Sequence, residues 1–110
     1  VCLAAIERLD GTALAAALEA AALELPRPAL LSSLLMPLMA RVGKLWHEGA
    51  LRVAHEHLAS SIVHSFLGTL HRCSPVPDSA PELIVVAPAG QHHEFGAMTV
   101  AVAAATDGWR

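Results

Sequence analysis

The chain has 110 residues, of which 55% are hydrophobic and 15% are charged, with a formal net charge of −3. This balance predicts a folded, mostly helical protein and argues against a disordered chain. The seven Lys and Arg residues are scattered, which argues against a nucleic-acid-binding surface in this segment, and charged residues and prolines interrupt every apolar stretch before it reaches the roughly 18 residues of a membrane span.

The first two predicted helices are delimited by a polar turn and by a proline. Residues 1–9 are typical of the end of a helix. A turn follows in which Asp10 or Thr12 can cap the next helix, which helical spacing of apolar residues predicts over 13–25. Pro26 is expected to end this helix because it cannot continue the hydrogen-bond pattern.

Two longer helices complete a predicted antiparallel four-helix bundle. A broad apolar face follows residues 31–46, where Pro37 is expected to kink the helix. Gly49 is expected to form a left-handed C-cap. The fourth helix is predicted over 52–71, with Val53 among the residues that it buries. The short connections favour antiparallel neighbours.

The chain changes character after residue 73. Three prolines within residues 74–81 predict a linker. The continuous apolar run at 83–87 is typical of a strand buried on both faces of a parallel sheet. A loop follows, and residues 94–107 are predicted to be helical. This order predicts the first β-α unit of a truncated Rossmann-like α/β domain, whose further strands would lie beyond Arg110.

Unusual residues gather at the turn between the third and fourth predicted helices. A helical hairpin brings the end of one helix beside the start of the next, so Trp46 and the Glu56–His57 pair can face one flat, amphipathic ligand. Alternatively, Trp46 is a core residue and the pair forms a solvated first turn, where the helix dipole favours Glu. A zinc site is a third interpretation, although no His-Glu-x-x-His pattern is present.

The second unusual group lies in the loop after the predicted strand, residues 88–96. Loops at the carboxyl ends of such strands hold ligands in α/β sheets. His93 is either a metal ligand, with the polar side chain of Gln91 orienting its ring, or an ordinary loop histidine. Gly96 would let a bulky group approach the start of the helix. Without Gly-x-Gly-x-x-Gly or Lys, this is neither a dinucleotide loop nor a Walker loop.

Residues 42–60, with Trp46, nine residues and then Glu56–His57, resemble the helical cap of the cobalamin-binding module of CarH/LitR-type photoreceptor regulators, which are MerR-like transcription factors. The resemblance implies that Trp46 presses on the upper face of the corrin beside the adenosyl group. It implies that Glu56 hydrogen-bonds the ribose region, and that His57 ligates cobalt from above after light breaks the carbon–cobalt bond.

The loop from Gln91 through His93 to Gly96 is similar to the Asp/Glu-x-His-x-x-Gly motif of base-off cobalamin domains. The resemblance implies that the cofactor is adenosylcobalamin or methylcobalamin, with His93 as the lower axial cobalt ligand. Gln91 stands where the family has Asp or Glu. Its amide can accept a bond from the imidazole but carries no negative charge, which predicts weaker lower-face coordination than a Gln91→Glu variant would give.

The resemblance covers nearly the whole chain and implies its organisation. Residues 1–73 would be a four-helix-bundle cobalamin cap, 74–81 a linker, and 82–110 the incomplete start of a Rossmann-like cobalamin-binding domain. Such regulators assemble as tetramers and bind DNA through a separate N-terminal domain, which would precede Val1. The implied protein is a cytoplasmic sensor with no catalytic residues and no membrane partner.

Two other functions fit parts of this pattern. A corrinoid methyl carrier of a methyltransferase system would use the same bundle and histidine loop, but it has no adenosyl group for Trp46 and the Glu56–His57 pair to contact. A helical oligomerisation module without cofactor would instead offer an exposed bundle face to a partner chain.

Overall fold

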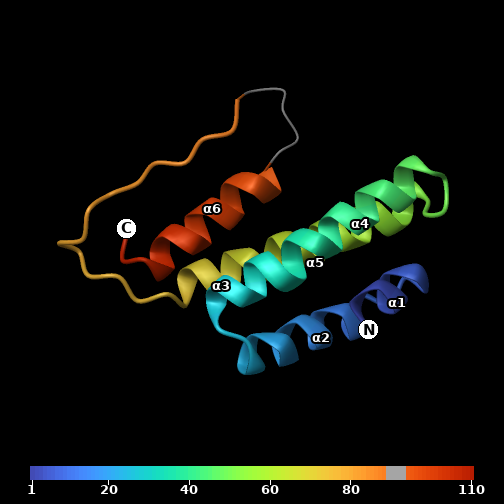
Figure 1. Cartoon of the computed structure of the whole chain (residues 1–110), viewed down its shortest axis with the longest axis horizontal. Coiled ribbons are helices and arrows are strands. Elements are labelled where there is room, and N and C mark those ends of the chain that lie inside the picture. The colour runs from blue at the N-terminus through green and yellow to red at the C-terminus, as the bar shows by residue number, and fades with distance from the viewer. Residues whose placement is uncertain (89–93) are drawn as a thin grey trace. The chain divides into compact units, whose positions relative to one another are not determined.

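Residues 1–88 and 94–110 are described by the computed structural model, and all of their regular secondary structure is helical (Figure 1). They divide into two units, residues 1–63 and 64–110. No helix in this part of the chain combines the length and the apolar character that a membrane crossing requires. The mostly helical architecture predicted for the first part of the chain is confirmed.

The first unit begins with α1 (Cys2–Glu7) and α2 (Gly11–Glu24), joined by a tight turn. Asp10 is the N-cap of α2, because its Oδ1 accepts a hydrogen bond of 2.9 Å from the backbone N–H of Ala13. The helix ends at Leu25, whose extended backbone leads into Pro26. The predicted capping and termination are therefore both confirmed.

The start of α2 lies close to the helix α5, which spans Val53–Arg72. A Cβ atom on Gly11 would come within 2.9 Å of Ile62 Cδ1 and 3.2 Å of Leu58 Cδ1. A larger residue at this position would make the ends of these two side chains shift. Gly11 thus marks a place where α2 and α5 pack closely.

The third helical run is continuous but changes its geometry. It comprises α3 (Arg27–Ala29), the π-helical segment η1 (Leu30–Leu35) and α4 (Met36–His47). Pro37 lies in the first turn of α4. Proline has no N–H and its ring collides with the carbonyl four residues earlier in an α-helix. The wider i→i+5 turns that precede it relieve this conflict, so the disturbance expected at Pro37 takes the form of a π-helix.

Helix α4 ends in a Schellman motif, and the left-handed C-cap predicted at Gly49 is confirmed. Gly49 has φ +81°, and its N–H donates to the carbonyl of Trp46 at 3.0 Å. The N–H of Ala50 donates to the carbonyl of Leu45 at 2.9 Å. These bonds satisfy carbonyls at the helix end and turn the chain sharply toward α5.

The core of the first unit is apolar and draws on every long helix in it. Its fully buried large side chains are Ile6, Leu14, Leu18, Leu30, Leu35, Val42 and Val63. The expectation that Val53 is buried is wrong, since 53% of this residue is exposed. The first buried residue of α5 is Ala59, and residues 53–58 are all exposed or partly exposed.

The second unit contains the end of α5 and the helix α6 (Glu94–Thr106). Leu67 and Val102 are its fully buried large residues. Gly108, with φ +90°, follows α6, and the N–H of Trp109 donates to the carbonyl of Ala104 at 2.9 Å. The predicted helix and its C-terminal glycine are confirmed.

The strand expected at 83–87 is not formed in the described structure. Leu83 instead donates its N–H to the carbonyl of Arg110 at 2.8 Å, and Arg110 donates to the carbonyl of Pro81 at 2.8 Å. Ile84 and Val86 are largely exposed. A parallel strand exists only through hydrogen bonds to neighbouring strands, so an apolar run without such neighbours cannot form one.

Candidate functional site

The structure places Trp46 on the surface at the end of α4. Leu38 and Val42 of the same helix are buried, whereas 48% of Trp46 is exposed. An exposed indole is a large apolar area left in contact with water. The interpretation of Trp46 as an ordinary core residue is therefore wrong, since about half of the residue is open to solvent.

The side chains of Glu56 and His57 lie next to each other in the first turns of α5. The Oγ of Ser60 donates to Glu56 Oε1 at 2.7 Å, and His57 Nδ1 lies 3.3 Å from Glu56 Oε2. The Glu56 side chain is only 28% exposed, while that of His57 is 75% exposed. The carboxylate is thus held in place by its neighbours, and the imidazole beside it has room to turn.

Val53 joins this pair on one face of α5. It precedes Glu56 by three residues and His57 by four, and residues at this spacing are neighbours on a helix surface. Its half-exposed side chain adds an apolar area next to the polar pair. Apolar periodicity alone predicts a buried Val53, whereas its i, i+3, i+4 spacing to Glu56 and His57 is the sequence signal that places it beside them. We call Trp46, Val53, Glu56 and His57 the hairpin site.

His55 positions the start of α5 through both of its ring nitrogens. Its Nδ1 accepts a bond of 3.0 Å from the N–H of Arg52, and its Nε2 lies 3.1 Å from the carbonyl oxygen of Glu7 at the end of α1. The two bonds together require the neutral tautomer that carries its proton on Nε2. The residue that follows His55 is Glu56, so this bridge ties the hairpin site to α1.

The chemistry of the hairpin site fits a flat ligand with an apolar face and a polar rim. The indole and the valine offer apolar contact, Glu56 accepts hydrogen bonds, and His57 offers an imidazole nitrogen. Among the described residues, no three His, Cys, Asp or Glu side chains gather into a set that could hold a metal ion. A metal that is already held by a macrocycle needs only an axial ligand from the protein, which a single imidazole can provide.

The other predicted site residues fall outside this unit. Gln91 and His93 lie outside the described residues. Gly96 lies in the first turn of α6 in the second unit, where it is exposed and where an added Cβ would meet no atom within 4 Å. The prediction of a lower-face ligand therefore stays a prediction.

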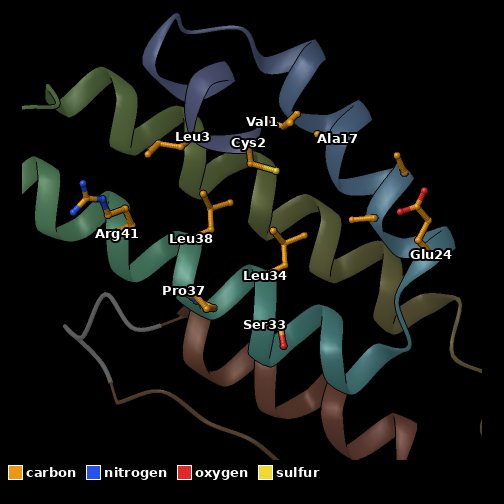
Figure 2. Close-up of a pocket in the computed structure, with 12 residues that line it drawn as sticks. Val1, Cys2, Leu3, Ala17, Glu24, Ser33, Leu34, Pro37, Leu38 and Arg41 are labelled. Atoms are coloured by element: carbon orange, nitrogen blue, oxygen red, sulfur yellow. The ribbon is translucent and has the colours of Figure 1, made fainter.

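The first unit also has a groove, which lies away from the hairpin site and has a different chemistry. It is a groove of about 560 Å³ between α1, α2 and the η1–α4 run, lined mainly by Ala, Leu and Pro side chains. Figure 2 shows Arg41 and Glu24 at opposite ends of this groove and Cys2 on its wall. Burial raises the pKa of the Cys2 thiol. The groove contains no imidazole and none of the predicted site residues.

Comparison with known proteins identifies the family of the helical part of the chain. Over 77 residues, or 69% of its length, the chain is 34% identical to the HTH-type transcriptional repressor CarA of Myxococcus xanthus. The chain spans 25% of the length of that protein. Residues 2–71 match the family described as the B12 binding domain. This match covers all of the hairpin site and confirms the resemblance seen in the sequence: the chain belongs to the B12-binding domain family.

Proposed function

We propose that this chain is the cobalamin-binding sensor module of a transcriptional regulator and that it responds to light through adenosylcobalamin. The observation that carries the proposal is the hairpin site, where an exposed indole and an internally bonded carboxylate lie in a segment that matches a B12-binding family. The similarity to a transcriptional repressor supports the regulatory role. When bound, adenosylcobalamin would supply a carbon–cobalt bond that light cleaves.

The residues of the hairpin site would contact the upper face of the cofactor. Trp46 and Val53 offer apolar surface to the ring, and the fixed carboxylate of Glu56 accepts hydrogen bonds from the adenosyl ribose. His57 is the candidate upper cobalt ligand after illumination. Its high exposure supports this role, because a loosely packed imidazole can change rotamer at little cost.

The residues after the bundle would contact the lower face of the cofactor. His93 would be the lower axial ligand, Gln91 would orient its ring, and Gly96 would allow the cofactor to approach α6. Residues 1–73 would then act as the cap, 74–81 as the linker and 82–110 as the first β-α unit of a Rossmann-like domain. The exposed apolar side chains of Ile84 and Val86 support this assignment, since they would be covered once neighbouring strands pair with this segment.

The proposed regulator would assemble as a tetramer in the dark and bind DNA through a separate domain. In the proposed mechanism the adenosyl group contacts only the conformation that assembles. Its removal by light would therefore shift the protein from the tetramer toward the dissociated form. The first test is a titration of the chain with adenosylcobalamin in the dark, followed by visible absorption, Trp fluorescence and light scattering before and after illumination. A spectral change on binding and a fall in mass on illumination are expected.

Three results would count against the proposal. Absence of any spectral change would leave a helical interaction module without cofactor as the better description. Binding without a light-dependent change of mass would favour the corrinoid carrier. A His57→Ala variant whose illuminated spectrum equals that of the unchanged chain would remove His57 as the upper ligand. His47→Ala is the matched control for this variant, since His47 is also an exposed histidine near the α4–α5 connection.

A further inference from the structure

Gly43 is a glycine that the fold of the first unit does not explain. It lies inside α4 and is exposed, and a Cβ atom added to it would meet no atom within 4 Å. Glycine in the interior of a helix is less favourable than alanine. Neither close packing, as at Gly11, nor a left-handed turn, as at Gly49, requires it here.

The position of Gly43 links it to the hairpin site. Gly43 precedes Trp46 by three residues and follows Met39 by four, so the three lie on one helical face, and Met36 lies on that face one turn earlier. Met36 and Trp46 are each about half exposed, and Met39 is partly exposed. We call these four residues the α4 strip. It is an apolar surface with a gap at Gly43, where the backbone itself is bare.

Resting on the proposed function, we propose that Gly43 is a contact position for the corrin ring, which lies along the α4 strip and reaches the helix backbone at this gap. Glycine is the residue that allows a ligand to approach a backbone closely. The rigid corrin ring can lie flat only on a surface without protrusions. A methyl group at position 43 would protrude between Met39 and Trp46 and keep the ring away from the helix. The strip is continuous with the hairpin site through Trp46, which favours the cofactor over a peptide as its occupant.

The test uses two substitutions at Gly43 and two matched ones at Lys44, the next residue, which is exposed and forms an ion pair with Glu48 rather than joining the strip. The variants Gly43→Ala, Gly43→Leu, Lys44→Ala and Lys44→Leu are made in a Trp109→Phe background, so that Trp46 is the remaining fluorophore. Each is measured twice: thermal unfolding without cofactor, and quenching of Trp46 by adenosylcobalamin added in the dark.

Opposite effects on stability and affinity are expected at Gly43. Gly43→Ala should raise the unfolding temperature of the cofactor-free chain by about 4 °C, because alanine favours the helix and nothing obstructs its methyl group. The same change should weaken adenosylcobalamin binding about tenfold, as overpacking of a rigid contact does, and Gly43→Leu should weaken it further. Both Lys44 variants should bind like the unchanged chain.

The outcomes separate this inference from the function on which it rests. If the unchanged chain binds adenosylcobalamin and the Gly43 variants bind equally well, the α4 strip is not a corrin contact, while the proposed function stands. If the Lys44 variants lose affinity to the same degree as the Gly43 variants, the contact is not specific to the gap and the inference is wrong. If the unchanged chain shows no quenching, the proposed function fails and the inference fails with it.

Discussion

His55 illustrates how one side chain can organise the site without facing the ligand. It is the third residue of α5, and its Nδ1 accepts the N–H of the residue that precedes the helix, as a Glu or Gln does in a capping box. Its Nε2 donates to a carbonyl that is 48 residues away in sequence. The bridge fixes the direction in which Val53, Glu56 and His57 leave the first turn of α5.

Replacing His55 should therefore destabilise the first unit in a graded way. His55→Ala removes both bonds and should lower the free energy of unfolding by about 1–2 kcal/mol. His55→Glu keeps the acceptor for Arg52 but has no proton for the Glu7 carbonyl, so it should be intermediate, whereas His55→Gln carries both groups and should lose least. Urea unfolding followed by circular dichroism measures the order. Equal stability of the Ala and Gln variants would show that the bridge contributes nothing.

The two cysteines should differ in their reaction with a thiol reagent. Cys73 is exposed, whereas Cys2 is buried and its pKa is raised by that burial. A raised pKa means less thiolate at a given pH, and the thiolate is the reactive species. With Ellman's reagent near pH 8, we expect one fast and one slow thiol, and only the slow one in a Cys73→Ser variant. In denaturant both thiols should react at the same rate; a fast reaction of Cys2 in the native chain would contradict the described packing.

The sequence predicts those site residues whose partners are close to them along the chain. Trp46, Glu56 and His57 form a recognisable local pattern, and the structure places the first on the surface and the side chains of the other two within 3.3 Å of each other. The role of His55 was not predictable, because its partner Glu7 is distant in sequence. The exposure of Val53 depends on which residues of other helices cover the first turn of α5, and hydrophobic periodicity carries no information on that.

Helix ends were the most predictable elements because their signals are local. A polar side chain at Asp10, a proline at position 26 and glycines at 49 and 108 each decide the backbone within a few residues. The π-helical segment was less predictable, since several hydrogen-bond registers can accommodate Pro37. The prediction of a strand at 83–87 is wrong for a different reason. The stability of a strand comes from hydrogen bonds to neighbouring strands rather than from its own residues.

The C-cap of α4 offers a direct test of how the connection to α5 is held. At Gly49, φ is +81° and an added Cβ would meet no atom within 4 Å, so a substitution there changes only the backbone energy. Gly49→Ala should lower the free energy of unfolding by about 1–2 kcal/mol, and Gly49→Asn should lower it less. Thermal unfolding checks both variants. An alanine variant as stable as the unchanged chain would mean that the left-handed turn is not required.

The two units of the chain differ in the size of their cores. Seven of the nine large side chains that are fully buried among the described residues belong to residues 1–63, and only Leu67 and Val102 belong to residues 64–110. Apolar burial is the main stabilising contribution in a small unit. The first unit should therefore be the stable part of the chain, and α6 should open more readily.

Hydrogen exchange on the native chain tests this difference directly. Amides of α6 should exchange faster than the central amides of α2 and α4, because fewer buried contacts oppose their opening. Val102→Ala removes two methyl groups from the smaller core and should weaken it by about 2 kcal/mol, which predicts still faster exchange in α6 with no change in α2 or α4. Val42→Ala, at a valine that is likewise fully buried, is the matched change in the larger core and should act on α2 and α4 instead. If either substitution accelerated exchange equally in both units, α5 would transmit stability between them and the chain would unfold as one cooperative body.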